Sequence, residues 1–334
     1  MLASLLALTL AGPGLAQPSS ATLSAGDRER MIDQAAALPR SHTLIVAVDG
    51  NTVIDEGFRG HSTDATANIK SLSKTLLSAL IGIAIERGVI ESVDQPIVEL
   101  LGNRVPAGID PRVKTITVGQ LLSMQAGLER TSGANYGGWV ASPNWVSDAL
   151  TRPFVAEPGG RMLYSTGNSH LLSAALTQAS GRSTLTLARE WLGAPLNIAI
   201  PPWTRDPQGI YFGGNEMGIT PRALLRIAEL YRQGGSLDGQ RVLPRAWVTA
   251  SWQPRTHSFF NGHDYGYGWF LTELDGERAY YGWGYGGQLI YVIPSRRMSV
   301  VMTSDPTPPS NGSAYTARVE ALISDMIDAM RNDG

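Results

Sequence analysis

The chain has 334 residues, 43% of them hydrophobic and 17% charged, so it can bury a large core as one domain or two closely packed ones. Its 27 Lys and Arg against 29 Asp and Glu give a net charge of −2, which offers no electrostatic basis for binding nucleic acid or an anionic membrane. It contains no cysteine, and this excludes disulfides, thiol catalysis, cysteine-ligated metals and a lipidated cysteine anchor.

Residues 1–16 resemble a secretory signal peptide. They are apolar, and cleavage after Ala16 would leave Gly14 and Ala16 at the small-residue positions of such a signal. The basic residues that usually open a signal are missing, which leaves the true N-terminus open. The segment is too short, and too interrupted by Pro13 and Gly14, to span a membrane. We therefore expect the protein to be periplasmic or secreted, with no membrane span.

The first folded elements are predicted to be a helix and a β-hairpin. Residues 26–38 place apolar side chains at helical spacing. Two runs rich in β-branched residues, Thr43–Val48 and Thr52–Phe58, flank the strong turn signal Asp49-Gly50-Asn51.

After a polar loop, the stretch Asn68–Gly88 predicts a helix that is buried on every side. It carries no charge from Thr75 to Ile85 and is apolar nearly all round. Gly88 supplies a stop signal.

The middle of the chain is predicted to be mostly helical. Thr220–Gly234 is the clearest helix, because Thr220 can cap it and Pro221 occupies its first position. Residues 133–144 are expected to form a loop. The other helical segments are expected at Asp94–Leu101, Thr117–Met124, 145–151, 169–180, 184–192 and Leu243–Gln253.

From Tyr265 the apolar pattern changes to a period of two, which is typical of strands. The predicted strands are Tyr267–Leu274, Arg278–Trp283, Gln288–Ile293 and Met298–Thr303, and a helix over Thr316–Met330 follows them.

This order of elements predicts an α+β fold. Strands lie at both ends of the sequence and helices in the middle, so we expect an antiparallel sheet built from both termini, flanked by the N- and C-terminal helices. We assign residues 26–66 and 255–331 to this sheet lobe and 67–254 to an inserted, mostly helical lobe. The active site is expected between the two lobes.

Ser71 and Lys74 form the first candidate for chemistry. They lie three residues apart at the start of the buried helix, so the hydroxyl and the amine can meet. Burial lowers the pKa of a lysine, and an uncharged amine can take a proton from a serine that acts as nucleophile. The free N–H groups at the helix start could stabilise an oxyanion. A Ser-x-x-Lys match can also arise by chance, but a structural lysine would be costly in this apolar setting.

Two further stretches could line a cleft. Tyr164-Ser165-Thr166 follows a Pro/Gly loop and precedes a helix, although a tyrosine there can equally serve packing. Gly282–Gly287 forms a strand edge without bulky side chains at alternate positions, where a ligand could approach, and such glycines also mark β-bulges.

Other known motifs are absent from the sequence or lack the neighbouring secondary structure that they require. It contains no Gly-x-Ser-x-Gly, His-Glu-x-x-His or Walker sequence. Gly282–Gly287 also fits Gly-x-Gly-x-x-Gly, but a strand follows it instead of the helix that a dinucleotide site requires. The five histidines are scattered and are expected to be surface or hydrogen-bonded residues rather than ligands. We expect neither a metal nor a cofactor.

Together, Ser71-x-x-Lys74, Tyr164-Ser165-Thr166 and the glycine-rich strand resemble the three motifs of the penicillin-recognising serine hydrolases. Their order and spacing are similar to those of class C β-lactamases, D-alanyl-D-alanine carboxypeptidases, family VIII carboxylesterases and 6-aminohexanoate-dimer hydrolases. The resemblance spans roughly residues 40–330. It extends to the stretches 121–127, 218–225 and 286–294.

The resemblance implies a β-lactamase-like fold and a catalytic set. Ser71 would be the acylated nucleophile, with Lys74 and Tyr164 sharing proton transfer. Which of these two is the acylation base stays open. The backbone N–H groups of Ser71 and Tyr285 would hold the oxyanion, and Trp283, Gly284 and Thr166 would contact substrate.

Two departures from the family pattern bear on the substrate. Thr166 stands where the lactamases usually have Asn, and Trp283-Gly284 stands where they place Lys or His followed by Thr-Gly. We therefore predict an esterase-like serine hydrolase that cleaves small esters or amides through a Ser71 acyl-enzyme, and prefers neutral esters to penicillins. The alternatives are a β-lactamase or D-alanyl-D-alanine carboxypeptidase, and a non-catalytic acyl-binding sensor domain. The only partner expected is the small-molecule substrate, and the oligomeric state is left open.

Overall fold

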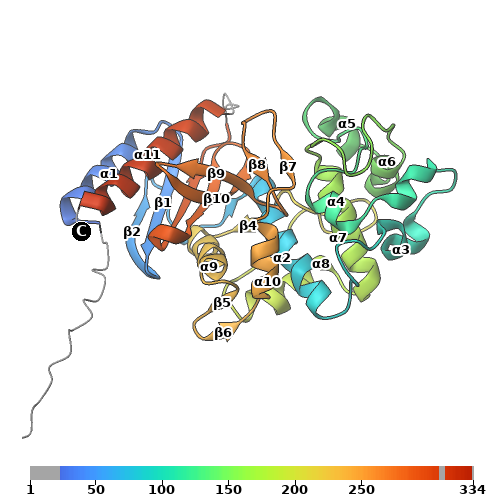
Figure 1. Ribbon diagram of the computed structural model, residues 1–334, viewed down its shortest axis with the longest axis horizontal. Helices are drawn as coiled ribbons and strands as arrows, with labels where there is room; N and C mark the ends of the chain where they lie inside the picture. The colour runs from blue at the N-terminus through green and yellow to red at the C-terminus, as the bar shows by residue number, and fades with distance from the viewer. Residues whose placement is uncertain (1–22, 308–312, 333–334) are drawn as a thin grey trace, which may run out of the picture.

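A computed structural model describes residues 23–307 and 313–332, and an eight-stranded antiparallel sheet lies at its centre (Figure 1). The proposed signal segment 1–16 lies outside the described residues. The order of the strands across the sheet is β2-β1-β12-β11-β10-β9-β8-β7. Their bounds are β1 Ser41–Val48, β2 Asn51–Gly57, β7 Thr256–His257, β8 Asp264–Tyr265, β9 Phe270–Leu274, β10 Glu277–Gly284, β11 Gln288–Ile293 and β12 Met298–Ser304.

The two ends of the chain meet in this sheet, which confirms the predicted assembly. β1 pairs with β12 on one side and with β2 on the other, and Ile45 lies opposite Val301. Alternate residues of β1 point to different layers: Leu44 and Val46 pack in one apolar cluster, and Ile45 and Ala47 in another. Because both faces are covered, β1 is apolar along most of its length.

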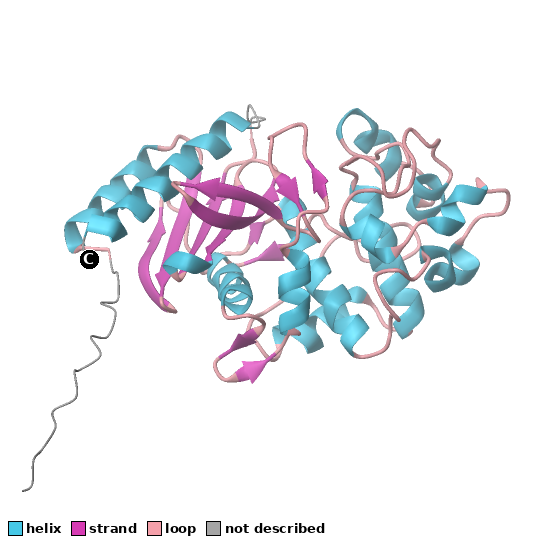
Figure 2. Cartoon of the chain, viewed as in Figure 1, coloured by secondary structure: helices cyan, strands magenta, loops and turns pink. Residues whose placement is uncertain are grey.

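Helices cover both faces of the sheet (Figures 1 and 2). α1 (Ala25–Ala37) and α11 (Ser313–Asn332) lie side by side over one face. α9 (Pro221–Arg232) packs against β11, β12 and β1 on the other face. α9 thus packs on the sheet although its place in the chain is within the stretch 67–254.

The remaining helices gather beside the sheet (Figure 2). α7 is the centre of this region, because it contacts α2, α3, α4 and α6. The helices are α3 Ile97–Leu101, α4 Val118–Leu122, α5 Tyr136–Val140, α6 Trp145–Leu150, α7 Thr166–Ser180, α8 Thr184–Ala188 and α10 Arg245–Ser251. Two two-stranded sheets complete the fold: the long-range pair of β3 Ala67–Asn68 with β4 Gly218–Ile219, and the hairpin of β5 Ser236–Leu237 with β6 Gln240–Arg241.

Some predicted boundaries were wrong for local reasons. The helix expected from Asp94 begins only after Pro96, which caps it in an extended conformation. The strand expected from Tyr267 begins three residues later, because Gly268 has a φ of +77° that a strand cannot continue. The loop predicted at 133–144 contains α5, whose Trp139 is fully buried. The strands β7 and β8 are too short to leave a periodic pattern.

α2 (Ser73–Glu86) runs between the sheet and the helical region, and it is buried as predicted (Figure 1). It contacts β10, α7 and α10, and all but its last two residues are buried. Any polar side chain at its N-terminal end is therefore held in the interior, next to the junction of sheet and helices.

Candidate active site

Ser71 lies in a short 3₁₀ turn, η1 (Lys70–Leu72), directly before α2, and not in the first turn of α2 as predicted. The cause is Lys70, whose φ of 51° is in the left-handed region. Such a conformation costs a non-glycine residue about 1 kcal/mol or more, so contacts must hold it. The amide of Lys70 donates to Asn68 Oδ1 at 3.0 Å, and Ser73 Oγ donates to the Lys70 carbonyl at 2.6 Å. Ser71 then lines a cavity.

Lys74, one helical turn further on, lies in the interior beneath Ser71 and is only 4% exposed. Its Nζ lies 3.0 Å from Ser71 Oγ, as the i to i+3 spacing predicted. Two more partners surround it: the Gly214 carbonyl at 2.7 Å and Thr166 Oγ1 at 3.3 Å. Among the described residues, no carboxylate forms an ion pair with Lys74.

Burial without a counter-ion lowers the pKa of Lys74 from its ordinary 10.5 to about 7. An uncharged amine has two N–H donors and one lone pair. The Gly214 carbonyl can only accept, and Thr166 Oγ1 can accept the second N–H. The lone pair is then left facing the Ser71 hydroxyl, which is the arrangement that a general base requires.

Tyr164 forms another wall of the cavity. The Nζ of Lys74 lies 5.1 Å from the centre of its ring, and the phenol lies near the Ser71 side chain. Burial raises the pKa of Tyr164, and the influence of Ser71 opposes this only in part. The phenol therefore keeps its proton at neutral pH, so it can donate or relay a proton but is a poor base.

Thr166, the first residue of α7, connects Lys74 to a loop that sequence reasoning did not single out. Ser132 Oγ accepts the Thr166 amide at 2.9 Å and lies 3.1 Å from Thr166 Oγ1. The chain Ser132–Thr166–Lys74–Ser71 is thus a continuous series of hydrogen bonds. No pattern in the sequence around Ser132 indicated this contact, because it joins two segments that are distant in the chain.

The cavity above Ser71 has a volume of about 520 Å³ and combines aromatic and charged walls. Trp283 and Tyr285 line it as predicted, and Tyr285 is 40% exposed. The sequence did not identify several other lining residues: Lys70, Arg130, Tyr136, Asn215, Glu216 and Phe260.

The charges of the cavity lie at its rim. Lys70 Nζ pairs with Glu216 Oε1 at 3.0 Å, and both side chains are about a quarter exposed. Arg130 is exposed, and no ion pair to its guanidinium occurs within the described part of the chain. The rim therefore carries one unpaired positive charge although position 283 is a tryptophan.

Gly282 and Gly284 pack against the Ser71 turn and do not face the cavity. A Cβ at Gly284 would lie 2.2 Å from the Ile69 carbonyl oxygen, and one at Gly282 would lie 2.3 Å from Leu72 Cδ1. The space above these two glycines is filled by η1 and the start of α2, and the approach of a ligand to this strand edge stays a prediction. Their role is to let β10 approach the Ile69 backbone and the Leu72 side chain on either side of Ser71.

The two amides predicted to hold an oxyanion are both free to donate. Within residues 23–307 and 313–332, neither the Ser71 nor the Tyr285 backbone N–H donates to another protein group. Ser71 and Tyr285 line the same cavity. That an acyl oxygen accepts from both amides stays a prediction.

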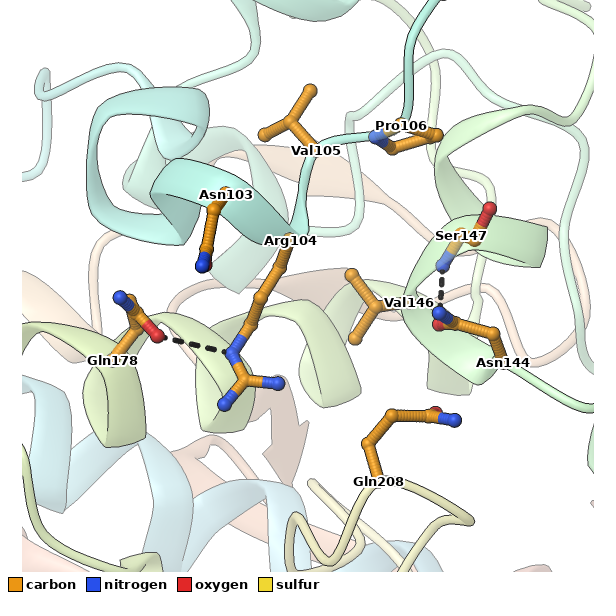
Figure 3. A pocket seen from close by; sticks show the side chains of 9 residues that line it. All are labelled: Asn103, Arg104, Val105, Pro106, Asn144, Val146, Ser147, Gln178 and Gln208. Atoms are coloured by element: carbon orange, nitrogen blue, oxygen red, sulfur yellow. Dashed lines mark hydrogen bonds between the residues drawn. The ribbon is translucent and has the colours of Figure 1, made fainter.

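A second hollow, of about 440 Å³, lies in the helical region and has a different character (Figure 3). Arg104, Gln178 and Gln208 project around it, and Arg104 Nε donates to Gln178 Oε1 at 3.2 Å. Its one hydroxyl, Ser147, has no lysine or histidine near it among the residues that line the hollow. The described residues also contain no group of three or more His, Asp or Glu side chains placed to hold a metal ion.

The chain matches the family model for Beta-lactamase over residues 28–324. Two solved structures have the same fold. A penicillin-binding protein homologue from Caulobacter crescentus has a TM-score of 0.73 and 19% identity, covering 93% of this chain and 98% of its own. A family VIII carboxylesterase has a TM-score of 0.69 and 17% identity, covering 92% of this chain and 99% of its own.

A shorter match links the chain to the protein named "Probable fimbrial assembly protein FimD, serogroup H1" of Dichelobacter nodosus. The identity is 31% over 144 residues, or 41% of this chain and 36% of the relative. The match thus spans about a third of the length of that relative.

Proposed function

The chain belongs to the beta-lactamase family, and on that premise we propose that it is a serine hydrolase that cleaves small esters or amides through an acyl-enzyme on Ser71. The family and the fold agree with the resemblance and the α+β architecture expected from the sequence. The observation that carries the proposal is the contact between Lys74 and Ser71. A buried lysine without a carboxylate lies 3.0 Å from a serine hydroxyl at the floor of a cavity.

In the proposed acylation step, Lys74 is the base. Burial brings its pKa to about 7, so the uncharged amine is available at neutral pH. Its lone pair takes the Ser71 proton while Oγ attacks the acyl carbon. The carbonyl oxygen becomes an oxyanion and accepts hydrogen bonds from the Ser71 and Tyr285 amides.

Collapse of this intermediate expels the alcohol or amine. The leaving group needs a proton, and the Lys74 ammonium holds the one that came from Ser71. Tyr164 lies beside Lys74 and near Ser71, so its phenol can give its own proton to the leaving group while it takes the Ser71 proton from the Lys74 ammonium. Water then attacks the acyl-enzyme with the same base, releases the acid and restores Ser71.

The cavity walls support an ester or an uncharged amide as substrate. Trp283, Phe260 and Tyr136 present apolar surface around Ser71, which suits an acyl or aromatic group. The structural neighbour that is named a carboxylesterase supports the same class. Trp283 and Phe260 belong to the proposed sheet lobe, and Ser71 and Tyr136 to the proposed helical lobe, so the cavity fits a site between lobes.

Turnover of p-nitrophenyl butyrate by the wild type and by Ser71→Ala tests the proposal. We expect turnover to fall to background in Ser71→Ala and to persist in Ser78→Ala, a serine of α2 that bonds the Tyr267 carbonyl away from the cavity. Intact-mass spectrometry over time separates the enzyme from an acyl-binding sensor: a transient adduct supports the enzyme, and a persistent one the sensor. Equal turnover in the wild type and Ser71→Ala would refute the proposal.

Export from the cytoplasm stays a prediction from residues 1–16. No helix among the described residues has the length and apolar character needed to cross a bilayer.

A further inference from the structure

His170 and Asp206 form a buried polar pair that the proposed chemistry does not use. Both side chains are fully buried, and His170 Nε2 lies 3.0 Å from Asp206 Oδ2. The aromatic rings of Trp139, Trp145 and Phe212 surround the imidazole. A buried pair of this kind is costly to form, so its hydrogen bonds indicate what it holds in place.

The hydrogen bonds around the pair fix the tautomer of His170. Asp206 Oδ1 accepts the backbone amides of Gln208 at 2.9 Å and Ile210 at 2.8 Å, so Oδ2 is the atom that meets the imidazole. A carboxylate only accepts, and therefore His170 Nε2 carries the proton. The other ring nitrogen, Nδ1, is then an acceptor, and it receives the Gly213 amide at 3.3 Å.

Gly213 is followed directly by the residue that holds Lys74. The Gly214 carbonyl accepts from Lys74 Nζ at 2.7 Å, the shortest of the three Lys74 contacts. Both glycines are required by space, since a Cβ at Gly213 would lie 2.2 Å from the Ser169 carbonyl and one at Gly214 would lie 2.6 Å from Lys74 Cγ. The segment 213–214 thus fits tightly between α7 and the lysine.

α7 therefore reaches Lys74 by two routes. Thr166 contacts Nζ directly, and His170, one turn later on the same face of the helix, acts through Gly213 and Gly214. We propose that His170 and Asp206 are positioning residues: they orient the Gly214 carbonyl toward Lys74 and so keep the amine lone pair directed at Ser71. This inference rests on the proposed function, and it adds to it the device that aims the base.

Two substitutions of His170 separate the role of Nδ1 as an acceptor from the role of Nε2 as a donor. His170→Asn places an amide oxygen close to the position of Nδ1, so it keeps an acceptor for the Gly213 amide and loses the contact with Asp206. His170→Gln reaches the position of Nε2, so it keeps a donor for Asp206 and loses the acceptor. Both variants remove a ring from the same aromatic surroundings, and both are expected to lower thermal stability.

Asp206→Asn tests the tautomer itself. In this variant the two backbone amides hold the oxygen of the side-chain amide in place of Oδ1, which turns the NH₂ group toward His170. The proton of the imidazole must then move to Nδ1, where it opposes the Gly213 amide, as a wrong tautomer does in other histidine–carboxylate pairs. We expect this variant to behave as His170→Gln does.

The measurement is kcat/KM for p-nitrophenyl butyrate against pH, below the melting temperature of each variant. We expect His170→Gln and Asp206→Asn to lose about tenfold in kcat/KM and His170→Asn about threefold or less. A carbonyl acceptor stabilises the charged form of Lys74. Loss of this acceptor in His170→Gln and Asp206→Asn should therefore lower the pKa of Lys74 and move the acidic limb of the kcat/KM profile to lower pH. The groups that face Lys74, namely Tyr164, Thr166 and Ser71, and the rim pair Lys70–Glu216 are unchanged in all three. Activity that only follows stability, with one common pH profile, would overturn the inference.

Crystal structures of the wild type and the two His170 variants decide the same question without any substrate. The Gly214 oxygen should stay near its 2.7 Å distance from Nζ in His170→Asn and move beyond about 3.5 Å in His170→Gln. An unchanged distance in His170→Gln would contradict the inference. A wild type that is no more active than Ser71→Ala refutes the proposed function and leaves this structural result to decide the role of His170.

Discussion

The floor and the rim of the Ser71 cavity hold lysines only four residues apart in opposite environments. At the floor, Lys74 is 4% exposed, and its hydrogen-bond partners among the described residues are two hydroxyls and a carbonyl. At the rim, Lys70 is about a quarter exposed and pairs with Glu216 at 3.0 Å. Burial without a counter-ion turns one lysine into a group that can exchange protons near pH 7. The other forms an ion pair with Glu216 at the rim of the cavity.

Exchange of each lysine for arginine is the strongest test of this difference. A guanidinium cannot give up its proton at neutral pH, so Lys74→Arg should lower kcat/KM for p-nitrophenyl butyrate by about a thousandfold. Lys70→Arg keeps the charge and should cost about threefold or less, because the rim is solvated. Similar losses in the two variants would mean that the floor and the rim do not differ in this way.

The next largest effect is expected between substrates that react with the same Ser71 and Lys74 but differ in the charge that they bring to the rim. A β-lactam or a D-alanyl peptide brings a carboxylate, whose recognition needs a cation or several donors beside the third motif, and Trp283 offers no charge there. We expect kcat/KM for the best short-chain p-nitrophenyl ester to exceed that for nitrocefin or a D-Ala-D-Ala peptide by about a hundredfold. Nitrocefin hydrolysis that matches the best ester would place the protein with the β-lactamases.

The buried Lys74 should also make the free energy of unfolding depend on pH. Its pKa is about 7 in the folded protein and near 10.5 in the unfolded chain, so between these values the unfolded chain binds more protons. Stability should then rise with pH by up to about 1.4 kcal/mol per unit, or about 2 kcal/mol from pH 7.5 to 9. Lys74→Met removes this contribution. Urea denaturation at several pH values should show the free energy of unfolding of the wild type rising with pH relative to that of Lys74→Met. Unfolding free energies that change with pH in the same way in both proteins would exclude the lowered pKa.

The floor was largely predictable from the sequence and the rim was not. Ser71 and Lys74 lie in one buried apolar helix and its preceding turn, so spacing alone indicated that they meet. Thr166 followed from the second motif, but Ser132, which contacts Thr166, and the Gly214 carbonyl, which contacts Lys74, come from separate loops with no periodic signal. Helical and strand periodicity likewise predicted the sheet and the long helices, whereas β7, β8 and α5 were too short.

The rim residues come from turns whose conformation depends on long-range contacts. Glu216 has a left-handed φ of 59°, and it bonds Asn68 as well as Lys70. The short pairing of β3 with β4 brings these segments together. A two-residue strand is invisible in a single sequence, so the Lys70–Glu216 ion pair could not be foreseen.

Arg130 offers the smallest of the expected effects and tests what the rim contributes. Its guanidinium lines the cavity without an ion pair among the described residues, so it can attract an anionic group on the acyl chain. We expect Arg130→Gln to lower kcat/KM for p-nitrophenyl hemisuccinate about tenfold, and for p-nitrophenyl butyrate about twofold or less. Arg161→Gln is the matched control, because Arg161 is exposed and lines the neighbouring hollow beyond Tyr164 but not the Ser71 cavity. Salt should reduce the wild-type preference for the hemisuccinate, since the contact is solvated. If Arg130→Gln lowers both esters equally, the arginine supports the loop and does not select the substrate.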